Sequence, residues 1–291
     1  MHYIGKFNEE DLTVPQIYAA HSQGYTQANL VDHTCGSVHT GLSIAQLAAG
    51  GTLNPHVHSY EEGFYILEGE VLVGINDQAH LLRPGDFGAI KVGTTHSWRN
   101  IGSEQARWLQ MAAPQPKPMG KERDTFFVKG GAAPSQAEPL NPDDPKGNLL
   151  GHFDAGQIPP SEEGRIAAGG LKGVFLKWLI DANFGARHHR MLYLEYQPGV
   201  SIGLHDHTFE EAYFIVSGEV EATIDGHKYI AKPGDVLWTS VGCVHAFANI
   251  SDQPVRWLET FSPQPPAENV FRFMAEWEQK AKELEGEQGS R

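Results

Sequence analysis

The sequence contains the same set of ligand-type residues twice, at a constant spacing. The set consists of three histidines and a glutamate in each half: His56, His58, Glu62 and His96, then His205, His207, Glu211 and His245. Each member of the second copy lies 149 residues after its counterpart (205 − 56 = 149 and 245 − 96 = 149). Imidazole and carboxylate groups are common protein ligands of divalent transition metals. We therefore expect two similar units, each with one metal site.

The duplication extends beyond these residues. Arg83-Pro-Gly-Asp86 aligns with Lys232-Pro-Gly-Asp235, and Arg107-Trp-Leu109 aligns with Arg256-Trp-Leu258, without a gap. A repeat this long predicts tandem domains and not a solenoid. We expect an N-terminal domain over residues 1–118, an inter-domain linker over 119–172 and a C-terminal domain over 173–291. The linker assignment rests on the density of Pro, Gly, Ala and Asp between residues 112 and 147.

The local pattern within each unit predicts β-structure. Residues 70–75 and 219–224 alternate in character with period two, and Pro-Gly-Asp and Asp-Gly clusters interrupt such runs. Many short strands with regular turns favour an all-β fold of closed or sandwiched antiparallel sheets. One helix is predicted, over residues 267–287, where an apolar stripe recurs at helical spacing. Its members are Val270, Phe273, Met274, Trp277, Ala281 and Leu284.

Composition narrows the functional classes. The 291 residues carry a formal net charge of −14, which disfavours binding to nucleic acid or to an anionic membrane surface. The two cysteines, Cys35 and Cys243, occupy unrelated positions in the repeat and provide no disulfide framework. The first residues show no apolar leader segment, and no apolar run has the length needed to span a membrane. These features predict a cytoplasmic protein.

The spacing of the ligand-type residues constrains the site. His56 and His58 are two residues apart and project from the same face of a strand. Glu62 would lie roughly 13 Å away along an extended strand, at about 3.3 Å per residue, so the chain has to reverse direction after His58. His96 must return on a neighbouring strand. Four protein ligands on an ion that prefers six leave about two positions for water, substrate or dioxygen, which is a catalytic arrangement.

A second acidic residue precedes the glutamate in each copy. Spacing alone does not settle whether Glu61 or Glu62, and Glu210 or Glu211, would bind the ion. Glu62 and Glu211 are preferred because Gly69 and Gly218 follow them by seven positions. We also assign these two glutamates the catalytic role of proton acceptor.

These motifs resemble those of the cupins, and specifically the two-domain bicupins. The first cupin motif, G-x5-H-x-H-x3,4-E-x6-G, is matched by residues 50–69 and 199–218. The second, G-x5-P-x-G-x2-H-x3-N, is matched by residues 85–100 and 234–249, except that Lys91 and Ser240 replace its proline. The resemblance implies tandem double-stranded β-helix barrels with a bound divalent metal. Fe(II) is favoured, with Mn, Zn or Ni as alternatives; a cupin that has kept the barrel without the ion is the competing interpretation.

The resemblance leaves the reaction open. Our leading hypothesis is a metal-dependent, dioxygenase-like enzyme acting on a small enol, diketone, phenolic or aromatic substrate chelated to the metal. The alternatives are a redox-neutral isomerase, cyclase or decarboxylase, and a non-catalytic protein that binds small molecules. The expected partner is a small-molecule substrate, with a homodimer as an option and with no role for nucleic acid or membrane.

Several further residues are candidates for the pocket. Trp98 and Phe247 follow the last histidine of each set by two positions, and Tyr60 and Phe209 lie in the turn at the site mouth; all four are assigned to the substrate pocket. His39 and His188, which match between the copies, are expected to be structural. Cys243 is expected to be a buried spectator thiol.

Overall fold

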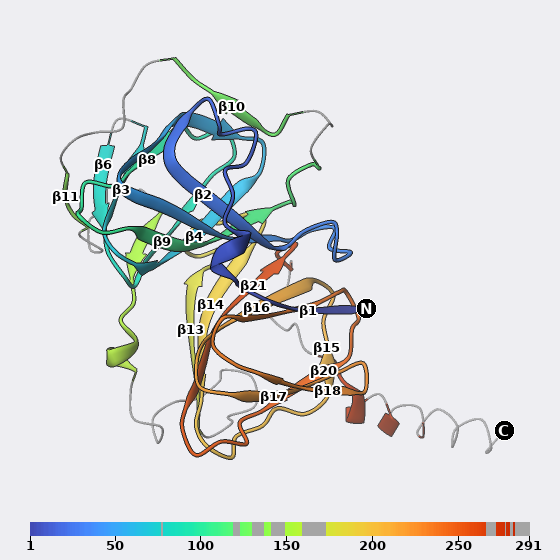
Figure 1. Cartoon of the computed structure of the whole chain (residues 1–291). Coiled ribbons are helices and arrows are strands. Elements are labelled where there is room, and N and C mark those ends of the chain that lie inside the picture. The colour runs from blue at the N-terminus through green and yellow to red at the C-terminus, as the bar shows by residue number, and fades with distance from the viewer. Residues whose placement is uncertain are drawn as a thin grey trace.

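The computed structural model describes residues 1–76, 78–118, 123–129, 137–140, 149–158, 173–265, 272–276, 278–279 and 282. Two barrels of antiparallel strands lie one above the other, with the N-terminal barrel uppermost in Figure 1. The all-β tandem-barrel fold predicted from the sequence is confirmed. Among the described residues, no helix combines the length and apolar character needed to cross a bilayer.

The N-terminal barrel is built on one long, curled sheet. Its strands are β2 (Ser22–Val31), β3 (Gly41–His58), β4 (Glu61–Glu68), β5 (Val71–Ile75), β6 (Gln78–Leu82), β7 (Asp86–Ile90), β8 (His96–Arg99) and β9 (Ala106–Ala113). The long strand β3 pairs with β9 through its first half and with β8 through its second half. It therefore runs through both walls of the barrel. The interior is packed with apolar side chains, including Trp98, Trp108 and Phe64.

The C-terminal barrel repeats this arrangement in two sheets. Its strands are β13 (Val174–Ile180), β14 (Arg190–Tyr196), β15 (His205–Asp206), β16 (Glu210–Ser217), β17 (Val220–Ile224), β18 (His227–Ala231), β19 (Asp235–Thr239), β20 (His245–Ala248) and β21 (Val255–Ser262). With β1 (His2–Lys6), one sheet has the order β1-β19-β16-β21-β14-β13. With β22 (Arg272–Phe273), the other has the order β18-β17-β20-β15-β22. Its interior is packed with Tyr196, Phe247, Trp257 and further apolar residues.

Turn and backbone geometry explains several residues of the repeats. Asp225 and Gly226, at φ 49° and 79°, join β17 to β18 in the two-residue turn that Asp-Gly favours. Gly69 and Gly218 have φ 69° and 76°, and a Cβ on either would collide with the backbone of the strand beside it. The last glycine of the first cupin motif is thus required by close backbone approach.

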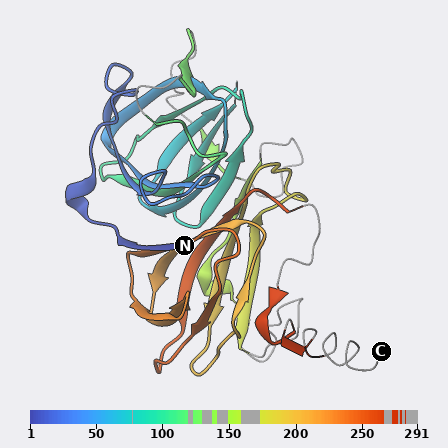
Figure 2. The ribbon, with the colours of Figure 1, turned by 90° about the vertical axis from the view of Figure 1, so that its right-hand side faces the viewer.

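The barrels exchange edge strands. β1 (His2–Lys6) crosses from the N-terminus to pair with β19 of the C-terminal barrel, as Figures 1 and 2 show. Conversely, β12 (Leu150–His152) pairs with β7 of the N-terminal barrel. The edge strand β19 of the C-terminal barrel is thereby covered by the segment before the first repeat, and the edge strand β7 of the N-terminal barrel by the segment before the second repeat. Covering an edge removes unpaired backbone groups that would otherwise attract other chains.

The segment predicted as a linker also contributes to the N-terminal sheet. β10 (Thr125–Phe127) pairs with β3, and β11 (Glu138–Pro139) pairs with β6. Two short 3₁₀ turns flank the barrel strands, η1 (Glu9–Asp11) and η2 (Ala155–Gln157). The proposed domain boundaries at residues 118 and 173 remain a prediction, to which the structure adds these strand pairings.

An apolar cluster joins the two barrels. It includes Leu109 and Met111 of β9 on one side and Met191 and Tyr193 of β14 on the other, all nearly fully buried. The barrels therefore share a core through their sheet faces, in addition to the exchanged strands. Burial of this apolar area stabilises the pair as one unit.

The C-terminal helix begins later than predicted. Arg272 and Phe273 form strand β22, which pairs with β15, and helical residues follow at 274–276, 278–279 and 282. The expected start at residue 267 is wrong at residues 272–273, because backbone pairing with β15 overrides the helical spacing there. The remainder of the predicted helix, which includes Val270, Trp277, Ala281 and Leu284, lies outside the described residues.

Candidate metal centres

The first histidine triad lies inside the N-terminal barrel. His56 and His58 project from the end of β3, and His96 on β8 is the direct cross-strand partner of His56. One ring nitrogen of each comes within 4.8 Å of the others. Strand β3 ends at His58 and β4 begins at Glu61, so the chain reverses as expected and returns Glu62 to the triad. The Glu62 Oε2 atom lies 3.2 Å from His58 Nε2 and 3.9 Å from His96 Nε2.

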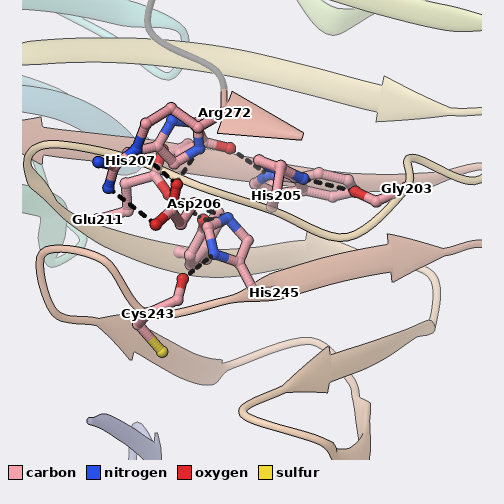
Figure 3. Close-up of polar contacts among 11 residues, drawn as sticks. Gly203, His205, Asp206, His207, Glu211, Cys243, His245 and Arg272 are labelled. Atoms are coloured by element: carbon pink, nitrogen blue, oxygen red, sulfur yellow. Dashed lines mark hydrogen bonds and ion pairs between the residues drawn. The ribbon is translucent and has the colours of Figure 1, made fainter. Parts of the chain in front are cut away.

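The second triad repeats this geometry in the C-terminal barrel (Figure 3). His205 on β15 pairs across the sheet with His245 on β20, and His207 follows β15 directly. The Glu211 Oε2 atom on β16 lies 3.3 Å from His207 Nε2 and 3.2 Å from His245 Nε2. The structure therefore brings together all eight residues that the sequence assigned to metal binding, four in each barrel.

Hydrogen bonds fix the ring orientation of most of these histidines. The Nδ1 atom faces a backbone carbonyl two residues earlier in His56, His96, His205 and His245, at 2.7 to 3.0 Å. A carbonyl can only accept, so Nδ1 carries the proton and donates it. Nε2 is then the ring atom that can bind an ion, which is the arrangement that metal-binding histidines usually show. His58 differs in that its Nδ1 lies 2.9 Å from the Thr125 hydroxyl.

The donor set fits a divalent cation. The Nε2 atoms of His58 and His96 and the Oε1 atom of Glu62 are buried without a hydrogen-bond partner among the described residues. Burial, together with neighbouring rings, lowers the pKa of His56 to about 4 and that of His205 to about 3. Both rings are neutral near pH 7 and can act as ligands. Burying these three acceptor atoms without a hydrogen-bond donor costs folding free energy unless a cation binds there.

The structure resolves the ambiguity between the adjacent glutamates. Glu61 points away from the triad and binds the other barrel: its carboxylate accepts hydrogen bonds from the backbone N–H groups of Arg187 and His188 and pairs with the His189 ring at 2.8 Å. Glu210 does the same in reverse, accepting from the Ser37 hydroxyl and from the N–H groups of residues 38–40. His39 and His188 thus contribute their backbone N–H groups to these contacts.

The surroundings of the two triads differ. In the N-terminal barrel the Gln110 amide donates to Glu62 Oε2 at 2.9 Å. In the C-terminal barrel the Tyr213 hydroxyl donates to Glu211 Oε2 at 2.6 Å and lies 3.1 Å from His245 Nε2. Glu259 also interacts with Glu211, and burial together with the Glu211 charge raises the pKa of Glu259 well above its ordinary value.

Tyr213 and Glu259 were not identified from the sequence. Both have a counterpart 149 residues earlier: Phe64 for Tyr213 (213 − 64 = 149) and Gln110 for Glu259 (259 − 110 = 149). Aligning the whole repeat, and not only its motifs, would have shown that a phenol and a carboxyl are added in one copy. Tyr213 occupies a variable position of the first cupin motif (residues 199–218), and Glu259 lies outside both motifs.

A short strand that follows each repeat covers the corresponding triad. In the N-terminal barrel β10 places the Phe127 ring 5.6 Å from that of His56. In the C-terminal barrel β22 places the Phe273 ring 5.7 Å from that of His205, and Arg272 forms a two-point ion pair with Asp206 at 2.7 and 2.8 Å. These segments shield the triads from solvent on one side.

The four predicted pocket aromatics occupy different places. Tyr60 stacks on His58 with ring centroids 4.3 Å apart, and Phe209 stacks on His207 at 4.8 Å. Trp98 and Phe247 lie in the barrel cores. Of the four, Tyr60 lines a cavity of about 740 Å³ beside the first triad, where Gln110 and Thr125 also contribute. The substrate-pocket role of all four remains a prediction.

The comparisons with known proteins agree with this geometry. The Cupin domain family matches residues 43–111 and 192–261. Over 94 residues the chain is 31% identical to polyketide synthase CurC of Streptomyces cyaneus. This match covers 32% of this chain and 61% of that protein. Over 97 residues it is 31% identical to protein SchB of Streptomyces halstedii. This match covers 33% of this chain and 70% of that protein.

Solved structures extend the likeness to both barrels. Oxalate decarboxylase of Lactobacillus farciminis, in a formate complex, superposes with a TM-score of 0.66 at 18% identity and covers 94% of this chain and 89% of that chain. An oxalate decarboxylase variant from Bacillus subtilis gives a TM-score of 0.64 at 19% identity and covers 94% and 80%. At this identity the likeness concerns the fold. With two matched domains and two histidine triads, the chain belongs to the cupin family as a two-domain member, a bicupin.

Proposed function

We propose that this bicupin is a metal-dependent enzyme that transfers a proton on a small enolisable carbonyl or phenolic substrate, and that the C-terminal barrel carries the reaction. One observation carries the proposal. The Tyr213 hydroxyl lies within hydrogen-bonding distance of both Glu211 and the Nε2 atom of His245, at the point where the ligand nitrogens converge. The N-terminal barrel has Phe64 at the equivalent position and lacks this hydroxyl.

The ion would be held by the three histidines and one glutamate of each set. A divalent metal at this position supplies a Lewis acid that polarises a bound oxygen atom of the substrate. Fe(II) remains the metal favoured from the sequence. Mn(II) is a strong alternative, since the oxalate decarboxylase of Bacillus subtilis, which shares the fold, has Mn(II) centres.

The residues of this chain would handle the proton. Tyr213, Glu211 and Glu259 form a connected set of a phenol and two carboxyl groups, which can accept a proton from a substrate carbon and return it elsewhere. Phe273 and the Arg272–Asp206 ion pair cover the site on one side and limit access of water. This set favours isomerisation, cyclisation or decarboxylation without net oxidation.

The substrate class is supported by the relatives. One of them is named as a polyketide synthase. Polyketides are rich in carbonyl groups, and a C–H bond between two carbonyls is readily deprotonated. The oxygen atoms of such a substrate are also of the kind that bind the divalent ions which three histidines and a glutamate would hold.

Oxygenation of the same class of substrate is the second candidate. It rests on the count of four protein ligands in each set, which is fewer than the six that ions such as Fe(II) prefer. The two reactions differ in oxygen consumption. The test is to incubate metal-loaded protein with β-keto acids, β-diketones and catechols in an oxygen-electrode cell and to follow products by NMR.

Turnover without oxygen uptake supports proton transfer, and stoichiometric oxygen uptake supports the oxygenase. His205→Ala/His207→Ala serves as the variant that removes the second site, and His56→Ala/His58→Ala is its matched control in the first barrel. Turnover that persists unchanged in the His205→Ala/His207→Ala variant would contradict the assignment to the C-terminal barrel.

A further inference from the structure

The exchanged strand β1 brings the N-terminus to a group of metal-ligand-type side chains outside both triads. β1 pairs with β19, so that His2 lies opposite Thr239, and the Met1 carbonyl accepts a hydrogen bond from the Ser240 N–H at 3.0 Å. This pairing holds His2 beside two turns of the C-terminal barrel. One is the turn at Asp225, and the other carries Cys243.

Three donors of different chemistry meet there. One ligand atom each from His2, Asp225 and Cys243 lies within 4.8 Å of the other two. His2 Nδ1 lies 3.2 Å from Asp225 Oδ2. Ligands bound at about 2.0 to 2.3 Å around a tetrahedral ion are separated by roughly 3.3 to 3.8 Å, so small adjustments would suffice for them to share one ion.

Cys243 faces this group and not the second triad. Figure 3 shows its sulfur directed away from the histidines, while its carbonyl oxygen accepts the hydrogen bond from His245 Nδ1 at 2.9 Å. The residue is 2% exposed. His2 and Asp225 are more exposed, with side chains 16% and 36% accessible, and they leave an entry path for an ion.

The other ring nitrogen of His2 is already anchored. His2 Nε2 lies 2.9 Å from the Tyr229 hydroxyl. In the hydrogen bond between His2 Nδ1 and the Asp225 carboxylate, Nδ1 carries the proton, since a carboxylate can only accept. An ion at Nδ1 would displace this proton to solvent, and Nε2–H would then donate to the Tyr229 hydroxyl, an outer contact that commonly orients metal-binding histidines. The ammonium group of Met1 lies 3.2 Å from the same Asp225 oxygen. A metal ion bound to Asp225 would take the place of this ammonium group as the positive partner of the carboxylate.

We propose that His2, Asp225 and Cys243 form a third metal site, which takes a divalent ion of Zn(II) type and fastens the N-terminal strand to the C-terminal barrel. Nitrogen, oxygen and thiolate donors together suit Zn(II), with water as the fourth ligand. On binding, the Cys243 thiol releases its proton to solvent as the metal–sulfur bond forms. The thiolate and the carboxylate then balance the charge of the ion.

The donor set is specific to the barrel that receives β1. The counterparts of Asp225 and Cys243 in the first repeat are Asn76 and Thr94 (225 − 76 = 149 and 243 − 94 = 149), which are poor ligands. Two ligand-type residues therefore occur only where the exchanged strand supplies the third. The site does not depend on the proposed enzyme activity.

Cobalt(II) provides a test because the two barrel centres have no sulfur donor. Protein comprising residues 1–291 with a C-terminal tag is stripped with chelator, reduced, and titrated with Co(II) alone. We expect a near-ultraviolet thiolate-to-cobalt charge-transfer band whose final intensity corresponds to one cobalt–thiolate bond per protein, which is absent in Cys243→Ser and persists in Cys35→Ser. The band should also persist in the His205→Ala/His207→Ala variant, which separates this site from the neighbouring triad.

Zinc analysis gives the second readout. Cys243→Ser and His2→Gln should each bind one ion fewer than the parent protein, and zinc should raise the thermal unfolding temperature of the parent more than that of either variant. Circular dichroism verifies that the variants are folded. Absence of the thiolate band in the parent protein at saturating Co(II), or its persistence in Cys243→Ser, would overturn the third site while leaving the two barrel centres untouched.

Discussion

The Glu61 carboxylate and the His189 ring form a buried pair across the two barrels, with 2.8 Å between Oε1 and Nδ1. Glu61 is the immediate neighbour of Glu62, and the His189 ring packs against Gly63 so closely that a Cβ there would overlap it. The strand that supplies the carboxylate of the first centre is therefore positioned by a residue of the other barrel. The reciprocal contact of Glu210 ties the second centre to the first barrel in the same way.

Acid should weaken this contact. Burial alone would raise the pKa of Glu61, but the hydrogen bonds and charge of His189 and the N–H groups of residues 187 and 188 outweigh it and lower that pKa to about 2. A depressed pKa contributes stability that is present above the ordinary value of 4.5 and is lost as the pH falls toward 2, on the order of 3 kcal/mol. Urea unfolding of chelator-treated protein between pH 5 and pH 2 should show a steeper loss of unfolding free energy in the parent than in Glu61→Gln. Glu68→Gln, at an exposed carboxylate, is the control, and equal slopes in all three proteins would contradict the prediction.

Removing two ligands should empty one barrel only. His56→Ala/His58→Ala is expected to halve the metal content of the two barrel centres, because each triad is complete within its own barrel. Elemental analysis of protein purified without chelator measures this directly. His33→Ala removes an exposed histidine of the same barrel and should leave the metal content unchanged. Unaltered content in the double variant would refute the ligand assignment.

The hydroxyl of Thr125 should tune the first centre. Thr125→Val keeps the side-chain shape and removes the partner of His58 Nδ1. Loss of such an outer hydrogen bond typically lowers metal affinity by about 10- to 100-fold. Competition with a chelator should reveal weaker binding in the N-terminal barrel and unchanged binding in the C-terminal barrel. Thr26→Val, at a threonine outside the site, is the control, and equal affinities in Thr125→Val and the control would argue against this role.

The extra polar groups of the C-terminal barrel should matter for turnover and not for metal content. Tyr213→Phe and Glu259→Gln each restore the residue found in the first repeat, so the barrel already tolerates these shapes in its other copy. We expect activity to fall by about 100-fold or more in each, as for the loss of a proton-transfer group, with the ion retained. The reverse changes, Phe64→Tyr and Gln110→Glu, should leave turnover by the C-terminal barrel unaffected. Full activity in both Tyr213→Phe and Glu259→Gln would remove the main support for proton transfer there.

Local sequence patterns were sufficient to predict the fold class and the histidines and glutamates that cluster in each barrel. His56 and His58 are two residues apart on a strand, so their side chains point to the same face in whatever sheet the strand joins. This property depends on the local sequence alone. The predicted helical start at residue 267 failed at residues 272–273 for the opposite reason. Arg272 forms strand structure because Asp206 and the edge of β15 are available, and the helical pattern contains no information about that partner.

The sequence by itself determined that two homologous β-barrels exist and that three histidines and an acidic residue recur in each. Only the tertiary structure decided which acidic residue faces the triad, because Glu61 and Glu62 differ by one position on a strand and therefore point to opposite faces. It also decided that β1 belongs to the far barrel and that His2 meets Cys243, since pairing between residues more than two hundred positions apart leaves no periodic trace in the chain.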